Sequence, residues 1–318
     1  MSAVLPAAKS GEAGAQRIAF VVMLAFFILG PLVMYPVFLM KVMCFALFAA
    51  AFNLLIGFVG LLSFGHAMFL GTAGYVCAHA AKVWGFTPEL AILAGAAAAA
   101  ALGLVTGLLA IRRQGIYFAM ITLALAQMIF FFCLQAPFTG GEDGIQAVPR
   151  GRLLGLLDLS NVWNMYGTVL VIFVAGFLLI YRTVHSPFGQ VLKAIRENEA
   201  RTTSLGYNTT RYKLMAFVLS AALSGVAGAT NALVFQLAAL NSVHWSMSGE
   251  VVLMNLVGGL GTIFGPVVGA FVVLAMENYL ATLGFWITIV QGAIFVLCVL
   301  AFRRGIVGEL GRLMRKPI

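Results

Sequence analysis

The chain has 318 residues, of which 62% are hydrophobic and only 9% are charged, and its mean hydropathy is +1.04. Soluble globular domains carry roughly 25% charged residues, so this composition excludes a soluble enzyme or binding domain and indicates a protein embedded in lipid. The net charge of +9 would suggest nucleic-acid binding in a soluble protein. In a membrane protein such an excess collects in cytoplasmic loops, so we expect a surrounding lipid membrane and no nucleic-acid partner.

Apolar runs separated by charges, prolines and polar clusters predict transmembrane helices, each of which needs about 20 mainly apolar residues. Seven such runs lie at residues 18–34, 37–58, 60–81, 88–111, 116–134, 165–181 and 214–240. A last apolar run, 250–302, is broken at Gly265-Pro266 and near Leu283-Gly284. At about 1.5 Å per helical residue it has room for two full spans or three short ones.

The basic residues favour three short spans in the last run. Residues 1–17 are then a cytoplasmic tail, and fifteen of the 19 lysines and arginines lie inside. Four lie outside: Lys41, Lys82, Arg150 and Arg152. This strong asymmetry predicts an all-α polytopic membrane protein of about ten helices, with both termini in the cytoplasm. Its parts are a tail at 1–17, a transmembrane domain at 18–302 with an external loop at 136–163 and a cytoplasmic loop at 184–213, and a basic tail at 303–318.

Eight helices plus a re-entrant segment form the main alternative topology. Residues 256–266 are rich in glycine, as in a broken helix, which is tolerated in a membrane only where protein or water surrounds it. The glycines Gly261, Gly265 and Gly269 recur at intervals of four and predict close helix packing. This packing is expected within the chain, with an interface to a second subunit as the alternative.

The longest polar interruption runs from Ser186 to Lys213. Ser186 followed by Pro187 is typical of a helix start, because serine caps the helix and proline fits its first position. Gly206 is a plausible helix stop. Between them Leu192 and Ile195 share one side and charged residues the other, which predicts a short amphipathic helix parallel to the membrane. Its apolar face is too short to hold in lipid, so we expect it in a protein groove; the alternative is a solvated connector.

Few polar side chains lie inside the predicted spans, and intramembrane polar groups are functional candidates by default. Glu250 lies near a predicted span end, where capping is an alternative role, and His66 has the alternative of bonding a neighbouring backbone carbonyl. The candidate residues for a translocation path are Asn53, Ser63, His66, Glu250 and Asn255.

The sequence carries no arrangement typical of an intramembrane enzyme, such as paired carboxylates or H-E-x-x-H. The four cysteines, at positions 44, 77, 133 and 298, lie in apolar runs without a C-x-x-C pair. We interpret them as small buried hydrophobic residues and expect neither a metal site nor catalytic residues.

Several segments resemble the permeases of branched-chain amino-acid ABC importers, and the LivM-type subunit especially. They are SPFGQVLKAIRENEA at 186–200, SLGYN at 204–208 and RYKLMAFVLSAALSG at 211–225. NLLIGFVGLLSFGH at 53–66, RQGIYFAM at 113–120, TGGEDG at 139–144, GGLGTIFGP at 258–266 and FRRGI at 302–306 agree in order. Glu199, Ala200 and Gly206 match the family's EAA-type coupling signature, although Arg201 stands where a second alanine is usual.

The resemblance implies a non-catalytic transport subunit that moves leucine, isoleucine and valine across the bacterial inner membrane. It implies as partners a second permease subunit, two ATPase subunits and a periplasmic substrate-binding protein. ATP and Mg would be used by the ATPases, with no cofactor on this chain, which has no G-x-x-x-x-G-K-[ST] motif. The expected ATPase-coupling residues are Ser186, Pro187, Gly189, Leu192, Ile195, Arg196, Glu197, Glu199, Ala200 and Gly206.

Two alternatives remain open from the sequence. An ABC permease for urea, short amides or other amino acids would look the same. An ion-coupled secondary transporter is less favoured, since it would need ionisable residues near mid-membrane, and the spans hold few.

Overall fold

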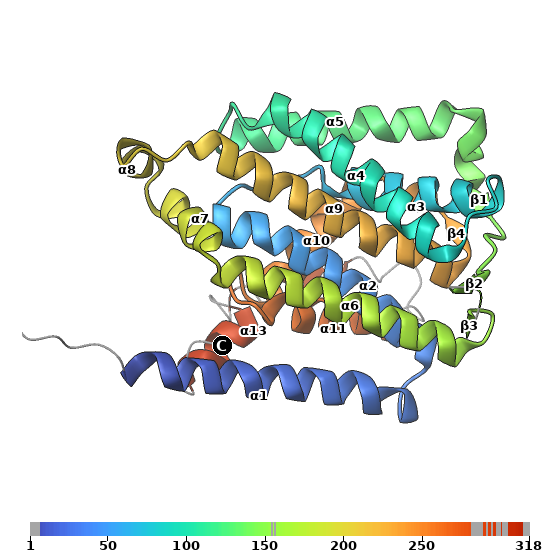
Figure 1. Ribbon diagram of the computed structural model, residues 1–318, viewed down its shortest axis with the longest axis horizontal. Helices are drawn as coiled ribbons and strands as arrows, with labels where there is room; N and C mark the ends of the chain where they lie inside the picture. Colours follow the sequence, from blue (N-terminus) through green and yellow to red (C-terminus); the bar gives the residue numbers. More distant parts are fainter. Residues whose placement is uncertain are drawn as a thin grey trace, which may run out of the picture.

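The computed structural model describes residues 7–153, 155, 157–280, 289–290, 292–293, 295–296, 300 and 305–313. Long helices lie side by side, with α7 and α8 at one end of the bundle (the α7 end) and short strands at the other (the strand end; Figure 1). The long helices are α1 (Ala7–Leu29), α2 (Pro36–Asn53), α3 (His66–Lys82), α4 (Pro88–Ala110), α5 (Ile116–Gln135), α6 (Val162–His185) and α9 (Thr209–Phe235). The shorter ones are α7 (Pro187–Glu197), α8 (Glu199–Ser204), α10 (Trp245–Gly258), α11 (Gly265–Leu280) and α13 (Gly305–Leu313).

The expectation of an all-α membrane protein is confirmed. Within the described residues, five helical segments are long and apolar enough to cross a bilayer: Pro36–Val59, Pro88–Ala110, Ile116–Gln135, Val162–His185 and Thr209–Phe235. Gln16–Leu32 and Gly265–Leu280 are shorter apolar helices. Most of residues 281–304, where we expected the last crossings, lie outside the described part of the chain.

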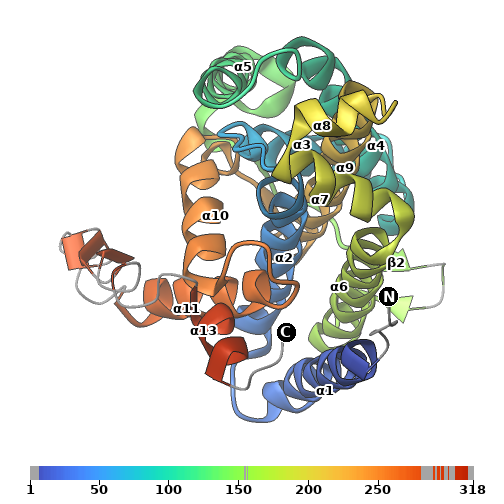
Figure 2. The ribbon, with the colours of Figure 1, turned by 90° about the vertical axis from the view of Figure 1, so that its left-hand side faces the viewer.

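Helix α2 lies at the centre of the bundle. Every residue from Val42 to Asn53 is buried, and α6, α9, α10 and α11 surround it (Figure 2). A helix that is apolar on all sides has no face to turn toward water and is stable only when covered all round. The apolar sequence of α2 therefore predicts its position inside the bundle, where it contacts several other helices.

Small residues let α3, α4 and α9 pack closely. A Cβ on Gly103 of α4 would come within 2.5 Å of the Ala221 side chain of α9, and one on Gly225 of α9 would come equally close to Ala99 of α4. A Cβ on Gly228 of α9 would overlap the carbonyl oxygen of Leu70 in α3. These contacts are of the small-residue kind that brings membrane helices together.

The helices are interrupted at two places close to the α7 end. Helix α2 continues into a π-helical turn, η2 (Leu54–Val59), which ends at Gly60 with a left-handed φ of 83°. The chain is then irregular up to His66, so α3 begins there rather than at residue 60, where we expected the third span. The second interruption, the glycine turn, comprises residues 259–264 between α10 and α11.

Two further boundaries differ from expectation. Helix α1 begins at Ala7, so much of the expected tail at 1–17 is helical and continuous with the first span. Gly261, expected in one packing series with Gly265 and Gly269, lies in the glycine turn with a φ of 76°. A left-handed φ is accessible to glycine without steric cost, so this glycine serves the turn, whereas Gly265 and Gly269 lie against the backbone of α10.

The strand end is built mainly from the expected external loop, 136–163. It contains the 3-10 turns η3 (Pro137–Thr139) and η4 (Gly141–Asp143) and the strands β1 (Ile145–Gln146), β2 (Arg152–Leu153) and β3 (Leu157–Asp158). β1 pairs antiparallel with β4 (Leu237–Ala238), and β2 with β3. Arg150 donates to the carbonyl of Val234 at 2.7 Å, which satisfies one of the orphan carbonyls at the end of α9.

Candidate functional site

The polar segment expected to form a coupling helix folds as two capped helices. The Ser186 hydroxyl accepts a hydrogen bond from the Gly189 N–H at 3.3 Å, and Pro187 occupies the first position of α7, as predicted. We expected the helix to continue toward Gly206, but it ends at Glu197. The reason is Asn198, which adopts an extended backbone and caps α8 by accepting from the Arg201 N–H at 2.9 Å.

The apolar face of α7 is turned toward this chain and not outward. Leu192 and Ile195 are buried, and α7 packs on α6, α9 and the π-helical turn η2. We expected this face to enter a groove of another protein. The structure corrects that interpretation: the face anchors α7 to its own bundle, and the outward side carries the exposed residues Pro187, Gln190, Ala194 and Glu197.

An open groove of about 1060 Å³ lies between α7 and the segment that joins α8 to α9. Leu205 and Tyr207 are exposed, and their segment forms the wall opposite Gln190 and Ala194 of α7. Leu205 and Tyr207 are not among the coupling residues predicted from the sequence, because helix periodicity does not extend into a turn. An aromatic and a leucine directly around Gly206 were the available signal.

Glu199 of the coupling signature is engaged inside the chain. Its carboxylate lies 2.5 Å from the Lys213 ammonium and accepts from the Gln114 side-chain amide at 2.7 Å. The Lys213 side chain is only 4% exposed. Glu199 therefore joins α8 to α9 and to Gln114 in the connection between α4 and α5. Ala200 and Arg201, by contrast, are exposed, so the arginine that departs from the family pattern lies on the surface of α8.

Arg196 is an exposed residue of α7 whose side chain reaches the end of the central helix. Its guanidinium donates a hydrogen bond to the Gly57 carbonyl in η2. This is a side-chain link between α7 and the end of the central helix.

The structure does not bring the path candidates together as the lining of one channel. The Asn53 amide nitrogen donates to the Thr262 carbonyl at 2.7 Å, and its oxygen accepts from the Gly261 N–H at 3.1 Å. Asn255 donates to a carbonyl one turn back in α10, at 2.8 Å, and the Ser63 hydroxyl accepts from the Gly65 N–H at 3.2 Å. All three side chains are buried, and each forms a hydrogen bond with a backbone group of this chain.

His66 is the first residue of α3 and is fully buried. Its Nε2 lies 2.9 Å from the Ser220 hydroxyl, which donates to the Ala51 carbonyl at 2.5 Å. Because that hydroxyl hydrogen is already used, Nε2 must carry the hydrogen donated to Ser220. His66 thus connects α3 to α9 and α2 through the Ser220 hydroxyl, and not through a direct bond to a backbone carbonyl, which was the alternative role.

Glu250 belongs to a group of ionisable residues from three helices. Lys41 of α2 lies 3.5 Å from Glu277 of α11, and Glu277 contacts Glu250 of α10. All three are partly exposed. They lie in those parts of their helices that are nearer the strand end. Lys41 is therefore close to the end of α2 and is also paired with a carboxylate.

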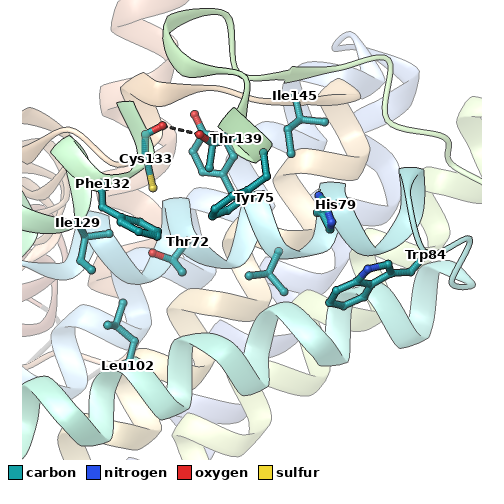
Figure 3. A pocket seen from close by; sticks show the side chains of 12 residues that line it. Thr72, Tyr75, His79, Trp84, Leu102, Ile129, Phe132, Cys133, Thr139 and Ile145 are labelled. Carbon is teal, nitrogen blue, oxygen red and sulfur yellow. Dashed lines mark hydrogen bonds between the residues drawn. The ribbon is translucent and has the colours of Figure 1, made fainter. Parts of the chain in front are cut away.

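A pocket of about 410 Å³ lies among α3, α4 and α5 near the strand end (Figure 3). Its walls are mostly apolar, and none of the five path candidates lines it. Thr72 and Tyr75 of α3 contribute hydroxyl oxygens that are buried and, within the described part of the chain, have no hydrogen-bond partner. Such groups cost free energy unless a partner reaches them.

The Tyr75→Phe variant tests whether that hydroxyl has a role. Its removal is expected to raise the melting temperature slightly, because an unpaired buried polar group is lost. Thermal denaturation in detergent is the measurement. A lower melting temperature would contradict this and show that the hydroxyl makes a stabilising contact.

Cys44, Cys77 and Cys133 are free and buried, as interpreted, and Cys298 lies outside the described residues. No group of three or more metal-ligating side chains is found among the described residues.

The fold and the site define a multi-pass helical membrane protein whose two interrupted helices meet a fixed pair of short helices at one end. The chain belongs to the family described as branched-chain amino acid transport system, permease component, which matches residues 34–299. It is of the LivM type within that family.

Two curated relatives are high-affinity branched-chain amino acid transport system permease proteins LivM. The chain is 27% identical to that of Salmonella typhimurium over 283 residues and 26% identical to that of Escherichia coli K12 over 278 residues. Each alignment covers 80% of this chain but 65% of the relative, so the chain spans just under two thirds of their length. The ribose import permease RbsC of Bacillus subtilis is 31% identical over 57% of this chain and 58% of its own. No solved structure matches significantly.

Proposed function

We propose that the chain is a permease subunit of an ATP-binding-cassette importer that moves leucine, isoleucine and valine across the bacterial inner membrane. It pairs with a second permease subunit and two ATPase subunits, and a periplasmic binding protein delivers the amino acid. ATP and Mg act on the ATPases, and this chain binds no cofactor. The α7 end and both termini face the cytoplasm, and the chain crosses the membrane about ten times.

The observation that carries the proposal is the rigid pair α7 and α8 with the open groove beside it. Both helices begin with a side-chain cap, and α7 is held to the bundle by the buried Leu192 and Ile195. The groove of about 1060 Å³ is lined by exposed apolar and aromatic residues, which are common at protein interfaces. A fixed, capped surface is suited to receive an ATPase subunit and to transmit its movement.

Substitution in the groove tests the docking site. Ala194→Arg places a long charged side chain in the groove, on the wall opposite Tyr207. We expect it to reduce co-purification of the ATPase and uptake by at least tenfold while leaving the melting temperature unchanged. Ser160→Arg, an exposed position at the strand end, is the control and should do neither. Unchanged co-purification of the ATPase with Ala194→Arg would remove the groove from the interface.

The cargo is assigned from the extent of the similarity. The LivM relatives align with 80% of this chain, whereas the xylose permease XylH and the ribose permease RbsC align with 52% and 57%. Urea, short amides and other amino acids remain alternatives of the same class. Vesicles containing the whole complex should accumulate labelled leucine with ATP, and excess isoleucine or valine should compete; competition by ribose or urea alone would overturn the assignment.

A further inference from the structure

Arg196 touches both interrupted segments of the bundle. Its guanidinium donates to the Gly57 carbonyl in η2. The stem of the side chain lies along Gly60, where a Cβ would come within 3.2 Å of the Arg196 Cγ. A Cβ on Gly261 in the glycine turn would likewise come within 3.2 Å of a guanidinium nitrogen. One side chain from α7 therefore contacts the end of α2 and the α10–α11 connection together.

These two segments are also joined to each other. A Cβ on Gly57 would come within 2.8 Å of the Gly261 backbone nitrogen. Asn53, one turn earlier, bonds the N–H of Gly261 and the carbonyl of Thr262. Figure 2, which looks at the α7 end, shows α7 beside α2, with α10 and α11 on the other side of α2. Arg196 thus lies where three parts of the fold meet: α7, the η2 end of the central helix, and the glycine turn between α10 and α11.

The chemistry of the contact suits an arginine. Gly57 lies within the last four residues of η2, where helix carbonyls have no intrahelical partner and the helix dipole favours a cation. The missing side chains of Gly60 and Gly261 leave room for the stem and the guanidinium. The planar guanidinium offers five donors in a fixed fork, whereas a lysine ammonium is a point charge on a flexible stem.

We propose that Arg196 is the positioning residue that transmits movement of α7 to the joint formed by η2 and the glycine turn. The proposal rests on the function proposed above, in which an ATPase subunit moves α7. Leu192 and Ile195 hold α7 to the bundle by apolar packing, whereas Arg196 forms a hydrogen bond with η2, where the central helix is interrupted. Movement of α7 then shifts the end of the central helix together with α10 and α11. This shift opens or closes the cytoplasmic entrance of the transport path.

The test compares Arg196→Ala and Arg196→Lys with Arg211→Ala, an exposed arginine at the same end, in the complete complex in lipid vesicles. We expect Arg196→Ala to retain the ATPase and its hydrolysis of ATP but to lower leucine uptake per ATP at least tenfold, with Arg196→Lys intermediate and Arg211→Ala unchanged. An unchanged ratio of uptake to hydrolysis would overturn the proposal, as would loss of the ATPase, since Arg196 would then act through docking. If Arg196→Ala does not accumulate, Arg196→Lys decides by the same ratio.

A second measurement does not depend on transport. A spin label on Leu260→Cys, an exposed position in the glycine turn, with the native cysteines replaced, is expected to change its mobility when ATP is added to the complex. Arg196→Ala should abolish that change, and a persisting change would overturn the proposal. If the unsubstituted complex transports no branched-chain amino acid but the label still responds through Arg196, the cargo assignment fails while the role of Arg196 holds.

Discussion

Glu199→Ala is expected to destabilise the protein without removing any contact to an ATPase. The substitution leaves the Lys213 ammonium, 4% exposed, without its carboxylate at 2.5 Å, and frees the Gln114 amide. Breaking a buried ion pair costs roughly 3–5 kcal/mol. Because the Glu199 side chain is 27% exposed, we expect a smaller loss of about 2–3 kcal/mol, measured as a lower melting temperature in detergent.

Two further variants separate packing from docking. Glu197→Ala changes an exposed acid two residues earlier and should leave the melting temperature unchanged. In the double variant Glu199→Ala, Lys213→Met no charge remains buried, so most of the lost stability should return. If Glu199→Ala is as stable as the unsubstituted protein and still fails to bind the ATPase, the carboxylate acts at the interface and not through its ion pair with Lys213.

The sequence predicts those features of the coupling segment that depend on neighbouring residues. Ser186 and Pro187 start a helix because the cap and the fixed proline φ are local effects, and both are present. The direction of the apolar face is not local. Leu192 and Ile195 turn inward because α6, α9 and η2 cover them, and the periodicity of α7 is the same whether the cover comes from this chain or from a partner.

The polar residues of the spans show the same limit. Composition and spacing identified Asn53, His66 and Glu250 as unusual, but their partners lie 209, 154 and 27 positions away, at Thr262, Ser220 and Glu277. A buried polar group must find a hydrogen bond, yet a single sequence does not say where. Gly261 illustrates a related error, since its spacing from Gly265 and Gly269 suggested a helix face, whereas its left-handed backbone places it in a turn.

Asn53→Leu is expected to destabilise the protein by removing the link between the central helix and the glycine turn. Asn53 is 2% exposed, and its amide bonds two backbone groups of the glycine turn, the Thr262 carbonyl at 2.7 Å and the Gly261 N–H at 3.1 Å. Leucine has a similar volume but satisfies neither group. Each unsatisfied buried group costs roughly 1–3 kcal/mol. Because both bonds are part-buried, we expect a loss of about 2–3 kcal/mol for the two together, measured as a lower melting temperature in detergent.

Asn255→Leu is the matched control for Asn53→Leu. Asn255 is equally buried, but its amide bonds only the Val251 carbonyl within α10, and its oxygen has no partner in the described part of the chain. Because its loss strands no group of another segment, its stability should change by less than about 1 kcal/mol. Equal destabilisation by the two variants would show that burial of an amide, and not the link from α2 to the glycine turn, sets the effect. A loss of stability in Asn53→Leu alone would show that these two hydrogen bonds hold the central helix to the connection between α10 and α11. Arg196 contacts the same connection at Gly261.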